Sequence, residues 1–129
     1  MPQTKEHTTA EKQQQIIAAI KDKAKTVVPA DSEVILFGSR ARGDAHEGSD
    51  WDILILLDKD HIQFSDYGQY SYPFRELGWE LGQYINVVLI TKKRWQEDVA
   101  SPFYENVTEE GIKIWAWLKK TEKTSLNIA

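Results

Sequence analysis

Three short apolar runs, separated by polar segments, most constrain the fold of this chain. They cover Val34–Phe37, Trp51–Leu57 and Ile85–Ile90, and polar residues or glycine flank each of them. Runs of this length that are rich in valine, isoleucine and leucine are typical of buried β-strands. Helical patterns lie between the runs. We therefore expect an α/β or α+β fold, with a small mixed sheet of about three to four strands flanked by helices.

Helical periodicity and capping signals place helices around these strands. Thr8 and Glu11 have the spacing of a capping box, and they predict a helix over about 9–26. A second helical pattern covers 62–82, where Pro73 is expected to kink or divide the segment. The remaining predicted elements are a helical turn within the loop 40–49, helices over about 92–99 and 101–111, and an edge strand over 112–117.

Length and composition indicate one domain over residues 1–129, with polar tails at about 1–7 and 119–129. A net charge of -4 makes nucleic acid an unlikely partner, although Lys92-Lys93-Arg94 form either a local basic patch or the solvated start of a helix. The chain has no cysteine, which excludes disulfides and thiolate metal sites. No apolar run approaches the ~20 residues that span a bilayer, so we expect a cytoplasmic protein without a membrane segment.

Two aspartates at the start of the second apolar run carry the first half of a chemical motif. Asp50 and Asp52 are two residues apart, so on a strand their side chains leave the same face with Cα atoms about 6.6 Å apart. Trp51, between them, is expected to point into the core on the other face. Two carboxylates at this spacing can converge on a hard cation such as Mg²⁺ or Mn²⁺, which relieves their mutual repulsion.

The second half of the motif follows the first apolar run. Gly38 allows a phosphate to approach the backbone closely, and Ser39 offers a hydroxyl and an amide donor. If the next residues form a helical turn, its free amides favour an anion, and Arg40 or Arg42 could neutralise a phosphate oxygen. A phosphate-binding turn and a pair of metal-binding acids are what phosphoryl-transfer chemistry requires.

At these residues the chain resembles the minimal nucleotidyltransferase (MNT) family of the DNA polymerase beta superfamily. Members carry glycine-serine, ten residues, then aspartate, any residue and aspartate, which Gly38-Ser39 and Asp50-Trp51-Asp52 match. The surrounding GSRARG sequence and the order of predicted elements extend the resemblance over about residues 10–115. The family's nucleotidyltransferase fold is the fold that the resemblance implies.

The same resemblance implies an activity and partners. Gly38 and Ser39 would bind the triphosphate of ATP or another nucleoside triphosphate, and Asp50 and Asp52 would bind the metal and carry catalysis. A nucleoside monophosphate, often AMP from ATP, would be transferred to an acceptor hydroxyl with release of pyrophosphate. Some relatives are antitoxins that modify a helical HEPN-type partner protein, so a protein acceptor is one implied partner.

The third apolar run departs from the family pattern. Such families usually place a third carboxylate there, whereas the only polar side chain in this run is Asn86. Asparagine can offer a neutral oxygen to a cation, but it supplies no charge and cannot act as a base. Asp58 lies about 20 Å beyond Asp52 along an extended strand, which is too far to substitute. Glu76 or Glu80, on the preceding helical segment, could reach inward.

Two hypotheses therefore remain open at this point. In the first, the chain is an active metal-dependent nucleotidyltransferase that uses Asp50 and Asp52, with Asn86 as a weak third metal ligand. In the second, Asn86 leaves a catalytically impaired module that binds a nucleotide or regulates a partner, as an antitoxin would. Incubation with labelled ATP and a divalent metal discriminates the two.

Overall fold

Four strands form one mixed sheet, in agreement with the predicted fold class. The strands are β1 (Glu33–Phe37), β2 (Trp51–Leu57), β3 (Ile85–Thr91) and β4 (Ile112–Ala116). Their order in the sheet is β3-β2-β1-β4. β2 and β3 are parallel, whereas β1 runs antiparallel to both β2 and β4. The computed structural model describes residues 9–116, so the predicted tails and Trp117 lie outside the described residues.

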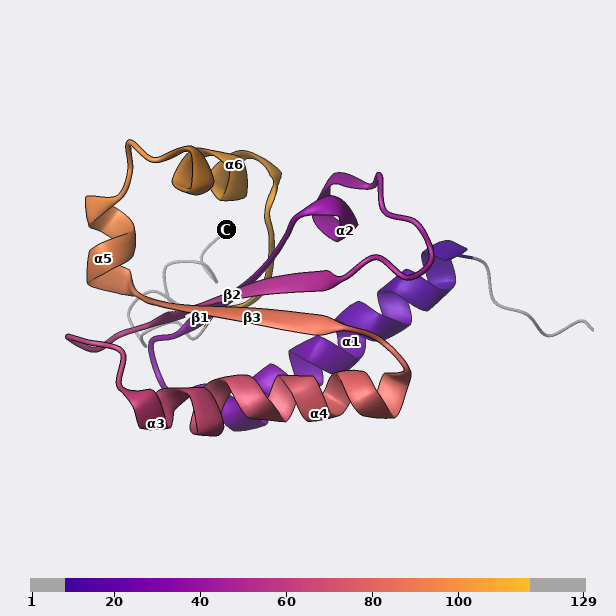
Figure 1. Cartoon of the computed structure of the whole chain (residues 1–129), viewed down its shortest axis with the longest axis horizontal. Helices are drawn as coiled ribbons and strands as arrows, with labels where there is room; N and C mark the ends of the chain where they lie inside the picture. Colours follow the sequence, from indigo (N-terminus) through magenta and orange to yellow (C-terminus); the bar gives the residue numbers. More distant parts are fainter. Residues whose placement is uncertain (1–8, 117–129) are drawn as a thin grey trace, which may run out of the picture.

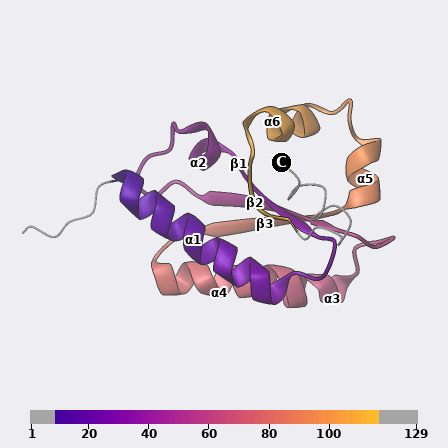
Figure 2. The ribbon, with the colours of Figure 1, turned by 180° about the vertical axis from the view of Figure 1, so that it is seen from behind.

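Helices cover both faces of this sheet (Figure 1). Viewed from the two sides, α1 and the α3–α4 segment lie on one face, and α2, α5 and α6 lie on the other (Figures 1 and 2). The helices are α1 (Thr9–Val27), α2 (Ser39–Arg42), α3 (Phe64–Asp66), α4 (Tyr72–Leu81), α5 (Lys92–Glu97) and α6 (Pro102–Glu110). Within residues 9–116, no helix has the length and apolarity that crossing a membrane requires.

Two apolar clusters fill the space between the sheet and its helices. The larger joins α1 and α4 to the odd-numbered residues of β2, such as Ile53 and Ile55. The smaller joins Leu54 and Leu56 of β2 to Trp95 of α5 and to Phe103 and Val107 of α6. From Ile53 to Leu57, β2 is therefore buried on both faces, which explains why this part of its sequence is continuously apolar rather than alternating.

The helical segment before β3 is divided, as Pro73 predicted. A π-helical turn, η1 (Tyr67–Ser71), links α3 to α4, and the N–H of Tyr72 donates to the carbonyl of Tyr67 five residues earlier. Proline has no N–H and crowds the preceding turn, so it is tolerated at the start of a helix rather than inside one. Pro73 lies within the first positions of α4, directly after the wide turn.

The predicted helix starts on the C-terminal side of the chain are confirmed by their caps. Thr91 Oγ1 accepts a hydrogen bond from the backbone N–H of Arg94 at 3.1 Å and begins α5. Ser101 Oγ accepts one from the N–H of Tyr104 at 3.1 Å, and Pro102 follows as the first residue of α6. These caps satisfy amides that a helix start otherwise leaves unpaired. They fix α5 and α6 over the smaller apolar cluster.

Gly78 in α4 provides a test of how closely this helix packs against the start of β3. A Cβ at this position would lie 2.6 Å from the carbonyl oxygen of Gln83 and 3.3 Å from Ile85 Cγ1. We expect Gly78→Ala to lower the free energy of unfolding by about 1–3 kcal/mol through overpacking, despite the better helix propensity of alanine. Urea denaturation followed by circular dichroism measures the change.

Gly68 in η1 is the matched control, because a Cβ there meets nothing within 4 Å. Gly68→Ala is expected to leave stability unchanged or to raise it by about 0.4–1 kcal/mol. An equal loss of stability in both variants would contradict close packing at Gly78.

Candidate active site

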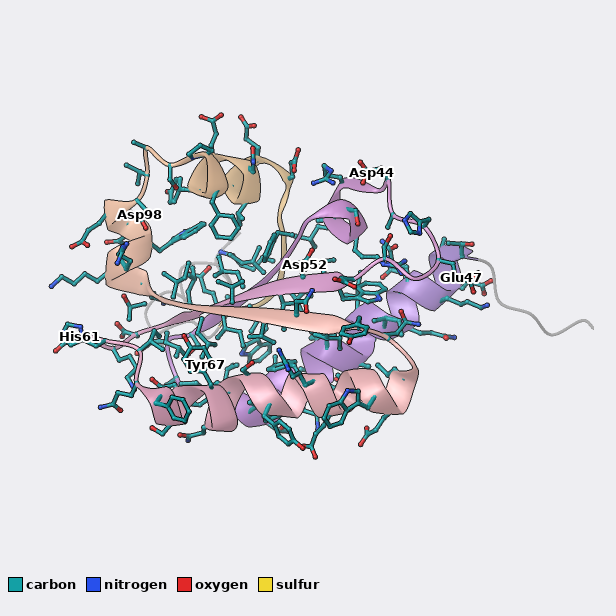
Figure 3. The ribbon with its side chains drawn as sticks, viewed as in Figure 1. Asp44, Glu47, Asp52, His61, Tyr67 and Asp98 are labelled. Atoms are coloured by element: carbon teal, nitrogen blue, oxygen red, sulfur yellow. The ribbon has the colours of Figure 1, made fainter. Side chains whose placement is uncertain are left out.

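The register of the sheet brings the predicted acids and the third strand together. Asp52 is the second residue of β2, and its neighbours in the sheet are Phe37 at the end of β1 and Asn86 on β3. Asp50 immediately precedes β2. The end of β1 and the beginnings of β2 and β3 therefore meet at the same end of the sheet, beneath α2 (Figure 3).

Asn86 contacts both aspartates. Its Nδ2 donates a hydrogen bond to Asp50 Oδ2 at 2.8 Å and another to Asp52 Oδ1 at 3.2 Å. The amide thus lies at the point where the two carboxylates converge, with its partially positive hydrogens facing two anionic oxygens. A hard cation fits the same point, because it prefers oxygen ligands and Asn86 can turn its amide to present Oδ1. The donor set on the protein is then two carboxylates and one neutral oxygen.

No further acid joins this group in the described part of the chain. Within residues 9–116, no cluster of three or more His, Cys, Asp or Glu side chains could hold a metal. Glu76 and Glu80 are exposed on α4, which packs on the face of the sheet opposite Asp52. Neither therefore takes the place of a third carboxylate, because the helix presents both on the other side of the sheet. Asp58 follows the far end of β2, as the strand length predicted.

Gly38 meets Asp52 directly. A Cβ on Gly38 would lie 2.6 Å from Asp52 Oδ2. The backbone of Gly38 has a φ of 78°, which residues other than glycine rarely adopt. Only glycine therefore allows the turn and the carboxylate to come this close. α2 starts at the next residue, Ser39, so the predicted glycine-serine turn and the acids border the same space.

Arg40 turns into the protein rather than toward that space. Its side chain is only 8% exposed, its Nε and Nη2 donate to the carbonyl oxygen of Ser49 at 3.3 and 3.0 Å, and its guanidinium lies 4.5 Å from the centre of the Trp51 ring. Ser49 immediately precedes Asp50, so these contacts fix the chain where the acids begin. All of the contacts described for Arg40 point to a positioning role, and phosphate binding by Arg40 stays a prediction.

Arg42 lies at the surface of the same turn, close to two carboxylates. Its Nε donates to Asp44 at 3.2 Å, and its Nη1 lies 3.6 Å from Glu110. The hydrogen bond with Asp44, followed by that residue's charge, raises the pKa of Arg42 above its ordinary value, and Glu110 adds to the effect. Arg42 is therefore a cation beside the turn, and exchange of Asp44 for a phosphate oxygen would bring it into a ligand site.

Trp51 packs into the core, as expected. Its two hydrogen-bond partners, Gln83 and Tyr84, are residues that the sequence did not mark as part of the site. The ring is 1% exposed, and its Nε1 donates to Gln83 Oε1 at 2.9 Å. The backbone N–H of Trp51 donates to the carbonyl of Tyr84 at 2.7 Å. Gln83 and Tyr84 thereby lock the start of β3 against the start of β2. No motif marks them, because their role depends on a strand pairing that the sequence does not specify.

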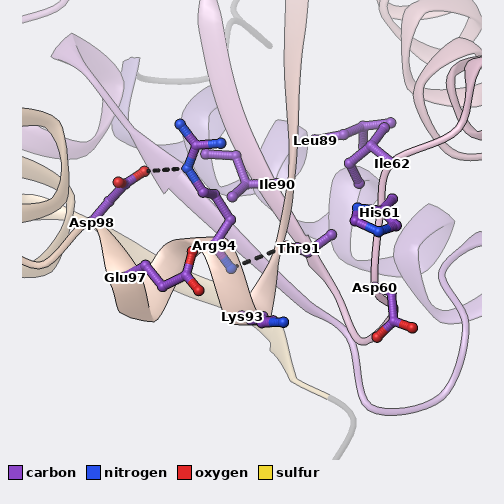
Figure 4. A pocket seen from close by; sticks show the side chains of 10 residues that line it. All are labelled: Asp60, His61, Ile62, Leu89, Ile90, Thr91, Lys93, Arg94, Glu97 and Asp98. Atoms are coloured by element: carbon purple, nitrogen blue, oxygen red, sulfur yellow. Dashed lines mark hydrogen bonds and ion pairs between the residues drawn. The ribbon is translucent and has the colours of Figure 1, made fainter.

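A hollow of about 550 Å³ lies away from this site. It lies at the opposite end of β3 and is lined by residues of the segments 60–62, 89–91 and 93–98, Lys93 and Arg94 among them (Figure 4). Figure 3 shows Asp52 and His61 at opposite ends of the sheet. Lys92 and Lys93 begin α5 at this far end and do not approach the acids. We place the candidate active site at the acids, because converging carboxylates and the glycine turn are found there and not in the hollow.

The site has an acid pair beside a glycine-serine turn, at one end of a mixed sheet that lies between helices. This is the arrangement of a nucleotidyltransferase fold. Comparison of the sequence with known families agrees with it. The chain belongs to the nucleotidyltransferase domain family, whose sequence model matches residues 14–123. A relative from Methanocaldococcus jannaschii, provisionally named a protein adenylyltransferase, is 37% identical over 79 residues, which are 61% of this chain and 73% of the relative.

Solved structures share the fold at low sequence identity. A protein of Sulfolobus solfataricus, provisionally described as a nucleotidyltransferase, matches with a TM-score of 0.59 and 22% identity, over 89% of this chain and 93% of its own. A toxin-antitoxin structure with AMP-PNP matches with a TM-score of 0.57 and 19% identity, over 87% of this chain and 81% of its own. A chain in the complex of tri-AMPylated Shewanella oneidensis HEPN toxin with MNT antitoxin matches with a TM-score of 0.51 and 20% identity, over 88% of this chain and 78% of its own.

The contact between Gly38 and Asp52 can be tested through metal binding. Gly38→Ala would place a methyl group 2.6 Å from Asp52 Oδ2 and displace that carboxylate. We expect the affinity for Mn²⁺ to fall about 10–100-fold, the range found when the support of a metal ligand is disturbed. Titration of free Mn²⁺ by electron paramagnetic resonance measures the affinity without any need for activity.

Gly43→Ala is the control for backbone strain, since Gly43 also has a positive φ, of 92°, but a Cβ there meets nothing within 4 Å. Each substitution is expected to cost about 1–3 kcal/mol of stability. Metal affinity should change only in Gly38→Ala. Unchanged Mn²⁺ binding in a folded Gly38→Ala protein would remove Gly38 and Asp52 from a common site.

Proposed function

We propose that this protein is a metal-dependent nucleotidyltransferase that transfers AMP from ATP to a hydroxyl group, with a protein as the acceptor. The observation that supports this most is the convergence of Asp50, Asp52 and Asn86 in front of Gly38. Membership of the nucleotidyltransferase family and the name of the Methanocaldococcus relative support adenylyl transfer. The relation in fold to toxin-antitoxin pairs supports a HEPN-type helical protein as the acceptor.

In the proposed site the triphosphate lies along the turn of Gly38 and Ser39. Gly38 leaves room for a phosphate oxygen next to the backbone, and Ser39 can donate from its hydroxyl and amide. Arg42 can leave Asp44 to neutralise phosphate charge. Asp50, Asp52 and Asn86 Oδ1 would hold a divalent cation, Mg²⁺ or Mn²⁺, which when bound supplies charge neutralisation to the reacting phosphate.

The acceptor hydroxyl oxygen attacks the α-phosphorus, and the bond from this phosphorus to the oxygen bridging the α- and β-phosphates breaks. Pyrophosphate leaves with the bonding electron pair, and the product is an AMP ester of the acceptor. Asn86 has no basic atom, so the hydroxyl proton passes to a carboxylate of Asp50 or Asp52 or to solvent. The protein contributes mainly by positioning and charge neutralisation.

The activity is tested by incubation with α-labelled ATP, Mg²⁺ or Mn²⁺ and a candidate HEPN-type protein. We expect label on the acceptor, and we expect Asp52→Asn to lower the rate at least ~100-fold because one metal-binding charge is lost. Asp58→Asn is the matched control, since Asp58 follows the same strand at its far end and is exposed. Equal loss in both variants would contradict a site at Asp52.

The second candidate function, a nucleotide-binding regulator without turnover, is favoured by one observation. The third strand offers Asn86, a neutral amide, where a third carboxylate would complete the charge of the site. Saturable binding of ATP without label transfer, under every metal and acceptor tried, would establish this function and exclude the first. Detection of transfer that disappears in Asp52→Asn would exclude it.

Asn86→Asp separates the two roles of this position. Without metal, a third carboxylate would repel Asp50 and Asp52 and replace two hydrogen bonds, so we expect a lower melting temperature. With Mn²⁺, the added charge is expected to raise metal affinity on the order of tenfold and to restore the melting temperature. Thermal melts with and without Mn²⁺ measure both effects. A variant that melts like the wild type under both conditions would contradict a shared site.

A further inference from the structure

β3 is an edge strand, and half of its backbone groups face away from β2. The N–H of Trp51 donates to the carbonyl of Tyr84, and the register pairs Trp51 with Ile85. In a parallel ladder a residue bonds to the two neighbours of its partner. Even-numbered residues of β3 therefore bond to β2, and the N–H and C=O groups of Val87 and Leu89 point outward. Within residues 9–116, no backbone group outside the sheet bonds to them.

The two edges of the sheet differ in their protection. β4 (Ile112–Ala116 in the described part of the chain), at the other edge, carries Lys113 and pairs with β1 through an irregular register. Charge and irregularity are among the features that prevent an edge strand from pairing with another chain. β3 has seven residues, INVVLIT, in a regular register with β2 and without charge or proline. It has the sequence of an internal strand but the position of an edge strand.

The geometry points to a second copy of this chain as the partner of β3, paired antiparallel across a two-fold axis. This interface goes beyond the proposed activity and does not depend on it. With Val88 on the axis, the outward groups of Val87 face those of Leu89 in the other copy, and Ile85 lies opposite Thr91. That register uses every outward residue of β3, and each sheet continues into the other.

The surfaces beside β3 complement each other in this arrangement. The hollow of about 550 Å³ lies along the second half of β3, between His61 and α5 (Figure 4). The two-fold axis brings to it the residues that precede Ile85 in the other copy, among them Tyr84, whose side chain is 74% exposed. A tyrosine ring can pack in such a hollow against the guanidinium of Arg94.

Charge complementarity also favours a second copy. Lys93, at the start of α5, forms no ion pair within residues 9–116, and Asp50 and Asp52 accept hydrogen bonds there from the neutral amide of Asn86. The antiparallel arrangement places the start of α5 of each copy near the beginnings of β2 and β3 in the other copy, where the acids of that copy lie. Because the contact is two-fold symmetric, the attraction occurs twice.

Cysteine cross-linking tests this register, because the chain contains no cysteine of its own. Val88 and Ile90 are both half-buried and pack against the same apolar cluster, which makes them a matched pair. In Val88→Cys, each sulfur faces its copy across Cα atoms about 4.5 Å apart, within the range of a disulfide. In Ile90→Cys the two cysteines are displaced by about 13 Å along the strands, which is too far.

We expect light scattering to give the wild type a mass twice the 14.9 kDa of one chain, and mild oxidation to cross-link Val88→Cys at least ~10-fold more than Ile90→Cys. Circular dichroism verifies that both variants are folded. A wild-type mass of one chain at the highest soluble concentration overturns the proposal, even if a variant fails to fold. A dimer that cross-links equally at both positions, or at neither, overturns this interface.

Discussion

Two carboxylates held at one point repel each other, and the candidate site is arranged around this repulsion. Asp50 and Asp52 leave the start of β2 on the same side, and parallel pairing with β3 places the amide of Asn86 between them, at 2.8 and 3.2 Å. Two hydrogen bonds from one neutral amide offset only part of the repulsion, because no positive charge is brought in. This remaining negative potential is the physical basis of the proposed binding of a divalent cation and, through it, of a triphosphate.

The rest of the fold keeps the acids and the turn at that point. Arg40 reaches from α2 to the carbonyl of Ser49 and lies against the ring of Trp51, so it ties the glycine-serine turn to the strand that carries the acids. Trp51 in turn bonds to Gln83 and Tyr84, which fixes the beginning of β3. Gly38 then brings the turn within contact of Asp52. A continuous set of contacts therefore links the three strand ends that form the site.

Much of this could be predicted from local sequence. The period of two along a strand places Asp50 and Asp52 on one side, the apolar runs mark the strands, and Pro73 marks the division between α3 and α4. The direction of Arg40 could not be predicted, because a long side chain next to the glycine-serine turn can face either way until its partner Ser49 is placed. The exclusion of Glu76 and Glu80 depends on the sheet face that α4 covers, which is a property of the tertiary packing. The bridging contacts of Asn86 depend on the register of β2 and β3, which no local pattern encodes.

The central claim is that Asp50, Asp52, Asn86 and the turn at Gly38 form one site for a metal-bound nucleotide. A crystal structure with Mn²⁺ and a non-hydrolysable ATP analogue tests it most directly, because the anomalous scattering of manganese locates the metal without reference to activity. We expect the manganese peak between the carboxylates of Asp50 and Asp52, with Asn86 turned to present its oxygen and the phosphates along Gly38 and Ser39. A nucleotide bound elsewhere, for example in the hollow beside α5, with no metal at the acids, would contradict the claim.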